Sequence, residues 1–142
     1  RSGVMAKTFQ LEIIASDHPF YKGECEMLVF PGIDGEYGIL AGHEEMVTCV
    51  GAGELRYQLD GIWKYAAVSA GFVEITPKKV ILLADTVERP EEIDTNRATE
   101  AKLRAEEKLR QKQSTQEYYQ TQAALNRAMS RLKVSNKNKE IY

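Results

Sequence analysis

The chain has 142 residues, of which 28% are charged and 43% hydrophobic, and its formal net charge is −2. These values are ordinary for a globular protein, and the absence of a basic tract excludes a general nucleic-acid binder. No window approaches the ~20 consecutive apolar residues that a membrane-spanning helix needs, and the first residues lack the apolar core of a secretory signal. Cys25 and Cys49 are too few for a disulfide framework, so both are expected to be buried, reduced thiols.

Composition divides the chain near Asp85. All ten glycines lie at or before Gly71, and all four prolines lie at or before Pro90. Residues 1–85 carry 7 basic and 12 acidic side chains, a balance of −5, whereas residues 86–142 carry 12 basic and 9 acidic ones, a balance of +3. The two parts are therefore predicted to fold differently and to do different work.

The first part reads as a succession of short strands. Residues 8–15 alternate apolar and polar side chains, and this period of two is typical of a half-buried strand. Residues 24–30 form a second alternating run, which is expected to be one strand ending in a turn at residues 31–35. Several such strands with regular turns predict a small sandwich or barrel.

Two hairpins are expected later in this part. The pair Asp60-Gly61, flanked by alternating residues, has the composition of a two-residue type I′ turn. Residues 72–75 and 80–84 predict another hairpin, whose second strand is expected to be wholly buried because it is a continuous apolar run.

The second part predicts two helices. Residues 91–112 consist mainly of strong helix formers after Pro90, which suits a helix start. The small residues Ala98, Ala101 and Ala105 recur at helical spacing and form a narrow apolar stripe. The apolar residues of the following helix also keep helical spacing: Tyr118, Leu125, Ala128, Met129 and Leu132.

A short break separates the two helices. The residues from Ser114 to Glu117 have the S-x-x-E form of a capping box, which predicts the start of the second helix. The short connection favours an antiparallel helical hairpin. An alanine-rich seam buries little area, so this hairpin is expected to be marginally stable and able to detach, and the polar run after Val134 is expected to fray.

The residues offer no catalytic machinery. His18 and His43 are the two histidines, and neither has a second metal ligand or a cysteine at a suitable spacing. Ser69 lacks the glycine two residues earlier that a nucleophile elbow needs, because position 67 is alanine. The sequence therefore predicts a protein that is not an enzyme and holds no metal.

Two groups of polar or glycine-rich residues have more than one interpretation when only the residues are considered. Asp94 and Arg97 on the first helix become neighbours of Arg127 and Arg131 if the hairpin closes, and clustered guanidinium groups favour phosphate. The alternative is a solvated face with Asp94 paired to one arginine. Similarly, the glycine-rich residues 35–43 are either a wide sandwich corner or a loop that docks another protein.

Several segments together resemble the epsilon subunit of bacterial F-type ATP synthases. They are residues 35–40 with Gly42 and His43, and then residues 67–75, 84–86, 93–98 and 127–132. The resemblance extends from about Lys7 to Val134. It implies a ten-strand β-sandwich over residues 6–88 followed by an antiparallel two-helix hairpin over residues 89–134. The residues themselves are interpreted as an expression scar and start over 1–5 and as a flexible tail over 135–142.

The resemblance also implies a role without catalysis. In that family the sandwich couples the gamma subunit to the ring of c subunits in the central stalk, through a docking loop that matches Glu36, Tyr37, Gly38, Ile39, Leu40, Gly42 and His43. The hairpin is a switch that permits turnover when folded down and opposes ATP hydrolysis when it extends into the alpha/beta catalytic head. The protein is then expected at the cytoplasmic face of the bacterial cell membrane, peripheral to it as part of the F1 sector, in ATP synthesis and ion transport.

Some members of that family bind one ATP in the folded-down hairpin. The matching residues here are Glu88, Ile93, Asp94, Arg97, Ala98, Arg104, Arg127 and Arg131. The resemblance implies that no cofactor is required and that ATP is a regulatory ligand, with Asp94 and Glu88 on the adenosine side and Arg97, Arg127 and Arg131 on the phosphates. The alternative is a free-standing nucleotide-sensing protein without a rotary partner.

Overall fold

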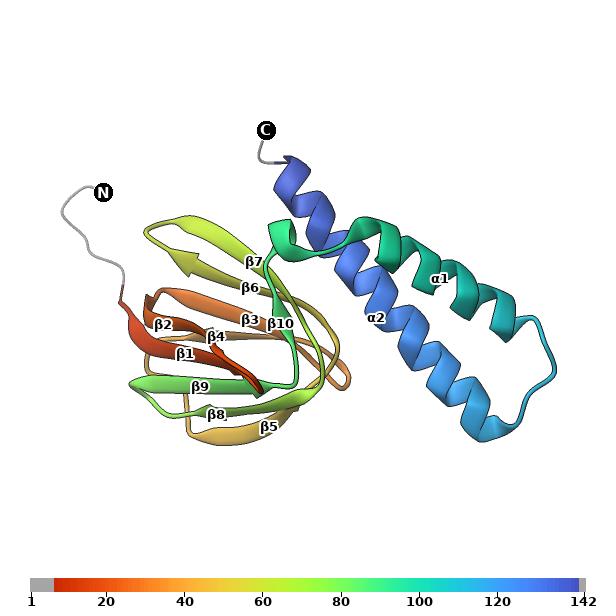
Figure 1. Cartoon of the computed structure of the whole chain (residues 1–142). Coiled ribbons are helices and arrows are strands. Elements are labelled where there is room, and N and C mark those ends of the chain that lie inside the picture. The colour runs from red at the N-terminus through yellow and green to blue at the C-terminus, as the bar shows by residue number, and fades with distance from the viewer. Residues whose placement is uncertain (1–6, 141–142) are drawn as a thin grey trace.

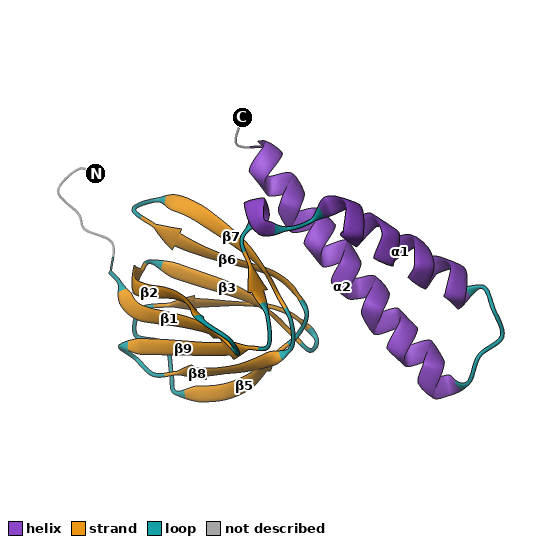
Figure 2. Ribbon diagram, in the orientation of Figure 1, coloured by secondary structure: helices purple, strands orange, loops and turns teal. Residues whose placement is uncertain are grey.

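The computed structural model describes the backbone of residues 7–140 and the side chains as far as Lys137. Within that range ten strands form two five-stranded sheets that face each other, and two helices extend from one side of them (Figures 1 and 2). The predicted class, a β-sandwich followed by a two-helix hairpin, is confirmed. None of the helices in this range is long and apolar enough to span a bilayer.

The first sheet has the strand order β2-β1-β9-β8-β5, and the second has the order β10-β7-β6-β3-β4. Neighbouring strands run antiparallel except β1 and β9, which pair in parallel. The strands are β1 Phe9–Ala15, β2 Pro19–Cys25, β3 Met27–Gly32, β4 Gly35–Leu40, β5 Met46–Val50, β6 Gly53–Leu59, β7 Ile62–Val68, β8 Gly71–Ile75, β9 Lys79–Ala84 and β10 Val87–Glu88.

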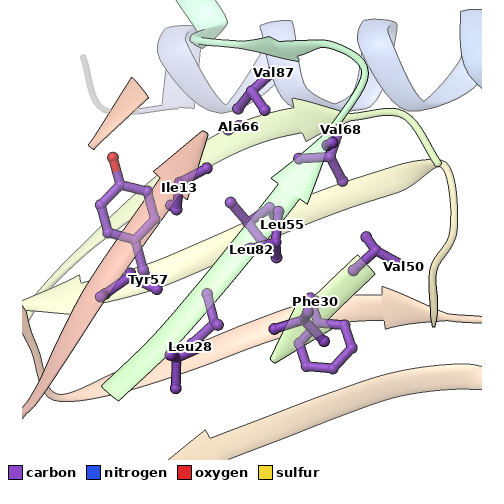
Figure 3. Close-up of a cluster of buried hydrophobic side chains, with 14 of the residues drawn as sticks. Ile13, Leu28, Phe30, Val50, Leu55, Tyr57, Ala66, Val68, Leu82 and Val87 are labelled. Atoms are coloured by element: carbon purple, nitrogen blue, oxygen red, sulfur yellow. The ribbon is translucent and has the colours of Figure 1, made fainter. Parts of the chain in front are cut away.

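One continuous hydrophobic core fills the space between the sheets (Figure 3). The alternation predicted for β1 is confirmed, because Phe9, Leu11, Ile13 and Ala15 are all buried. Side chains such as Leu55 reach the same core from the opposite sheet. Burial of this apolar surface is the main stabilising term of the sandwich.

The predicted turn between β6 and β7 is confirmed. Leu59 pairs with Ile62, and both central residues have positive φ, 50° for Asp60 and 77° for Gly61. Positive φ at both positions is what a type I′ turn requires, and Gly61 adopts it without a steric penalty.

The prediction of one strand over residues 24–30 is wrong. A bend at Glu26 separates β2 from β3, and the two strands belong to different sheets. Cys25 and Leu28 are both buried, so the chain points to the same core before and after the bend. The apolar pattern alone did not reveal this change of sheet.

The expectation of a wholly buried strand over residues 80–84 is also wrong. The hairpin of β8 and β9 is present, but Leu83 is 48% exposed on the outer face of the sheet, next to exposed Phe72. The expectation of two buried thiols holds for Cys25 only, since Cys49 is exposed.

The helical part begins later than the sequence predicted. A 3₁₀ turn, η1 (Pro90–Glu92), precedes α1 (Thr95–Leu109), and the Asp94 carboxylate caps α1 by accepting the Arg97 backbone N–H at 3.1 Å. Pro90 therefore starts the turn and Asp94 starts the helix. The predicted start of α2 (Thr115–Glu140) is confirmed, because Ser114 Oγ accepts the Glu117 backbone N–H at 3.2 Å.

The two helices form the predicted hairpin, with a seam of small residues. Ala98, Ala105 and Ala128 are buried along it. Tyr118 and Met129 were predicted on the apolar face of α2, but they are 46% and 49% exposed, so the seam is narrower than the apolar spacing suggested. Helix packing across alanines buries less area per residue than the sandwich core does.

The hairpin is docked on the sandwich through the C-terminal half of α2. Val134 lies fully buried with Ala67 of β7 and Ile93, in a cluster of its own. The prediction that the helix ends at Val134 is wrong, because residues 135–140 continue α2, with Val134 packed against the sandwich and Ser135 also buried. Residues 1–5 and 141–142, which the expected scar and the tail include, lie outside the described residues.

Candidate functional site

A cavity of about 610 Å³ lies where the hairpin meets the sandwich. Its volume is in the range of small-molecule sites. The sandwich side supplies Asp17, His18, Asp85, Thr86, Val87 and Glu88, η1 supplies Glu92, and the helices supply Ala101, Ala124, Arg127, Ala128 and Arg131. A ligand bound there would touch both parts of the molecule.

An ion pair lies in one wall of this cavity. Arg131 Nη2 of α2 donates a hydrogen bond to Oε2 of Glu88 at 2.8 Å. Arg131 Nε lies 2.8 Å from Oε1 of the same carboxylate but makes no hydrogen bond. The side chains are 34% and 27% exposed, so solvent screens the pair only in part. The pair joins β10 to α2 directly.

Arg127 lies one turn before Arg131 on the same face of α2. Its spacing of four residues makes the two guanidinium groups neighbours along the cavity wall. Arg127 is exposed, and within the described residues no ion pair of at most 4.0 Å involves it. Its charge is therefore available to an anionic ligand.

The structure separates the residues of the Ile93 to Ala98 motif from the cavity lining. Ile93 is buried in the cluster with Ala67 and Val134, and Ala98 is fully buried in the helix seam. Asp94 caps α1, and the side chain of Arg97 is exposed beside it. Of the predicted nucleotide residues, the cavity lining brings together Glu88, Arg127 and Arg131.

Arg104 lines a neighbouring hollow of about 360 Å³ between the helices. This hollow shares Ala101 and Ala124 with the cavity, and Lys108 also lines it. Arg104 is 4.0 Å from Glu100 in an exposed ion pair, which holds it weakly.

On the sandwich and η1 side of the cavity, the sequence analysis assigned only Glu88 to the ligand site. It gave no such role to the other polar residues there, which are Asp17, His18, Asp85, Thr86 and Glu92. They come from three separate segments, so no local spacing connects them. The adjacent Asp17 and His18 were the available signal, because a carboxylate beside an imidazole is a common functional pair.

Asp17 and His18 interact in the structure. His18 Nδ1 lies 2.7 Å from Asp17 Oδ1, and the hydrogen bond from His18 lowers the pKa of the Asp17 carboxyl group. Among the described residues, no group of three or more His, Cys, Asp or Glu side chains is arranged to hold a metal ion.

The predicted docking loop is mostly a strand. Residues 35–40 form β4, an edge strand paired with β3, and Gly42 has a φ of 81° in the loop that follows. Glu36 and Leu40 are exposed, whereas Ile39 is 2% exposed and belongs to the core. Ile39 is therefore not presented to a partner.

The remaining residues of this segment have local contacts. The Tyr37 hydroxyl donates to Asp34 Oδ1 at 2.9 Å, and the Tyr37 ring stacks on Phe30. Gly38 lies within β4, and Nδ1 of His43 is 3.0 Å from the carbonyl oxygen of Glu44. The exposed part of the segment is thus the outer edge of β4 with the loop after it.

The fold and the cavity define a class of protein: a β-sandwich that carries a docked helical hairpin, with a polar cavity at their junction. Residues 8–90 match the family described as ATP synthase, Delta/Epsilon chain, beta-sandwich domain, and residues 91–136 match its long alpha-helix domain. The chain belongs to the ATP synthase delta/epsilon chain family.

Curated relatives agree with this assignment. The chain is 48% identical over 132 residues to the ATP synthase epsilon chain of Ruminiclostridium cellulolyticum, covering 93% of this chain and 98% of that protein. It is 48% identical over 126 residues to the ATP synthase epsilon chain of Caldicellulosiruptor saccharolyticus, covering 89% and 92%.

Solved structures share the fold. One is a chain of the Euglena gracilis mitochondrial ATP synthase, with a TM-score of 0.78 and 22% identity over 92% of this chain and 82% of that one. Another is a chain of the Tetrahymena thermophila mitochondrial ATP synthase central stalk and c-ring, with a TM-score of 0.67 and 6% identity over 93% and 99%.

Proposed function

We propose that this protein is a non-catalytic epsilon subunit of the central stalk of a bacterial F-type ATP synthase. It couples the gamma subunit to the ring of c subunits, and its hairpin regulates ATP hydrolysis by exchanging between the docked form and a form that extends toward the alpha/beta head. The high identity to epsilon chains over almost their whole length supports this assignment.

The way the hairpin is attached supports a movable element. Its contacts with the sandwich include a small apolar cluster around Val134, the pair of Glu88 with Arg131, the pair of Lys133 Nζ with Glu54 Oε2 at 3.1 Å, and Lys137 Nζ over the Tyr65 ring at 5.3 Å from its centroid. Such a small interface is comparable to a transient one, so two positions of the hairpin differ by only a few kcal/mol.

We further propose that ATP binds in the junction cavity and stabilises the docked hairpin. The observation that carries this proposal is that Glu88 from the sandwich and Arg127 and Arg131 from α2 line one cavity. A ligand that touches both parts binds the docked form and not the extended one, so it shifts the population toward the docked form. Arg97 and Asp94 then support the site from the start of α1, outside its lining.

Calorimetric titration of the purified chain with ATP, and with ADP for comparison, tests the ligand. We expect one saturable ATP site, weaker binding of ADP, and at least a tenfold loss of ATP affinity in Arg127→Ala, because a charge-assisted phosphate contact is removed. Arg110→Ala is the matched control, because Arg110 pairs with Glu107 near the end of α1, outside the cavity lining. Unchanged affinity in Arg127→Ala would contradict the assignment of the site.

Co-purification tests the assembly. The tagged chain, produced in its own cells, should bring down the gamma subunit and fractionate with the membrane as a peripheral component of the complex. Recovery of a monomer without gamma would instead favour a free-standing nucleotide sensor.

A further inference from the structure

His18 enters the junction cavity from the sandwich, in the turn between β1 and β2. The turn is fixed to the neighbouring cavity wall, because the Ser16 hydroxyl donates to the Asp85 carbonyl oxygen at 2.8 Å. The Ala15 N–H also donates to the His18 carbonyl oxygen at 2.9 Å. The backbone of His18 is therefore held beside the segment that carries Glu88.

The imidazole is oriented by its neighbour. His18 Nδ1 is 2.7 Å from Asp17 Oδ1, and an ionised carboxylate can only accept a hydrogen bond, so Nδ1 carries the hydrogen. Nε2 is then the ring nitrogen that remains for a ligand, and the side chain is 44% exposed.

The charged side chains of the cavity lining have a net negative charge when His18 is neutral. Of the described lining residues, Arg127, Arg131 and His18 are those that can carry a positive charge, and Glu88 already neutralises Arg131. Besides His18, the charged residues that line the cavity are Asp17 on its own turn, Asp85 and Glu88 on the segment around β10, Glu92 on η1, and Arg127 and Arg131 on α2. These four carboxylates exceed the two arginines by two, and a proton on His18 would lower that excess to one, which reduces the repulsion that an anionic ligand meets.

We propose that His18 is a ligand-contacting residue of this cavity, and that its imidazolium, oriented by Asp17, donates from Nε2 to a phosphate oxygen of the bound nucleotide. The proposal rests on the function proposed above and adds a contact from the sandwich opposite Arg127. Its consequence is that nucleotide binding, and with it the docked hairpin, is favoured by mild acid, because histidine changes its charge between about pH 5 and 8.

The test compares ATP affinity at pH 6 and pH 8 for three proteins: the unmodified chain, His18→Asn and His43→Asn. His43 is the other histidine of the chain and does not line the cavity, so it is the matched control. Protonation of ATP itself contributes equally to all three. We expect the increase in affinity from pH 8 to pH 6 to be roughly three- to tenfold larger in the unmodified chain and in His43→Asn than in His18→Asn.

A second variant distinguishes the loss of positive charge at position 18 from a folding defect. His18→Arg carries a permanent positive charge, so it should bind ATP at pH 8 at least as tightly as the unmodified chain binds at pH 6, with little further change on acidification. Equal pH dependence in the unmodified chain and in His18→Asn would overturn the role of His18 while leaving the ATP site in place. Absence of saturable ATP binding by the unmodified chain at both pH values would overturn the proposed ATP site itself.

Discussion

The sandwich and the hairpin are stabilised in different ways. The sandwich encloses one continuous core to which nearly every strand contributes, including Phe30, Leu55 and Leu82. The hairpin has a seam of alanines, and its contacts with the sandwich include Val134, two ion pairs and the contact of Lys137 with the Tyr65 ring. Because burial of apolar area dominates folding stability, the sandwich should persist under conditions in which the hairpin detaches.

This difference suits the function proposed above. A rigid part would transmit torque between partners, and a weakly held part would respond to a ligand. The cavity lies at the boundary of the two parts, where a bound ligand would touch both. The predictions below test the contrast between the two parts.

The largest effect is expected in the sandwich core. Leu55 is fully buried, so Leu55→Ala removes packing from the centre of the core and should lower the free energy of unfolding by about 2–5 kcal/mol. Urea denaturation followed by the fluorescence of Trp63, the single tryptophan, measures this change. Leu103→Ala, at a position 60% exposed on α1, is the control and should change it by less than about 0.5 kcal/mol.

The next effect should be confined to the hairpin. Val134→Asp places an unpaired carboxylate in the cluster with Ala67 and Ile93, at a cost of about 2 kcal/mol or more, which should undock α2. Hydrogen exchange should then accelerate across α1 and α2 while the strands keep their protection. Met129→Asp, on the exposed face of the same helix, should leave exchange unchanged. A loss of protection in the strands of Val134→Asp would show that the two parts unfold together.

A smaller effect is expected at the ion pair of Lys133 with Glu54. The Glu54 side chain is 5% exposed, whereas Lys133 is 64% exposed and screened by water, so Lys133→Met should destabilise the docked hairpin by only about 1 kcal/mol. Adding Glu54→Gln removes the unpaired buried charge and should recover part of the loss. Hydrogen exchange of α2 in the single and double variants measures both changes. If adding Glu54→Gln does not recover stability, Lys133 contributes through the packing of its aliphatic chain and not through its charge.

The smallest effect on stability at neutral pH is expected from two titratable groups in the sandwich core, the Cys25 thiol and the Tyr57 hydroxyl. Burial raises the pKa of the Cys25 thiol from 9.0 to about 11 and that of the Tyr57 hydroxyl from 10.0 to about 12. Both groups bind their protons more tightly in the folded state, so their contribution to stability is complete below pH 9 and is lost as the pH rises toward 11 and 12.

Urea midpoints at pH 8 and pH 10.5 measure this contribution. The midpoint should fall at the higher pH, and the fall should be smaller in Cys25→Ala than in Cys49→Ala, because Cys49 is exposed. At pH 8 a thiol reagent should label Cys49 quickly and Cys25 only after unfolding. An equal fall of the urea midpoint in both variants would mean that titration of the Cys25 thiol does not cause the loss of stability at high pH.

Much of the fold was predictable because it depends on local signals. The alternation in Phe9–Ala15, the positive-φ pair at Asp60 and Gly61, and the cap at Ser114 each concern residues close together in the chain, and each prediction is confirmed. The strand boundary at Glu26 was not predicted, because the alternation continues through a bend at which the chain changes sheets.

The candidate site was predictable only on its helical side. Arg127 and Arg131 are four residues apart on one helix, so their common face follows from the helical repeat. The resemblance pointed to Glu88, but its ion pair with Arg131 spans 43 residues and depends on how the hairpin docks. His18 lies still further from α2 in the chain and carried no signal of a shared cavity.

The sequence by itself determined the two kinds of secondary structure, the division near Asp85 and the weak alanine seam, because periodicity, turn residues and helix propensity act over a few residues. Long-range packing sets which strands share a sheet, that α2 continues through Glu140, and that Asp17 and His18 line one cavity with Arg127. These features arise from contacts between distant segments, whose free energy depends on the packing of the whole chain and not on local pattern.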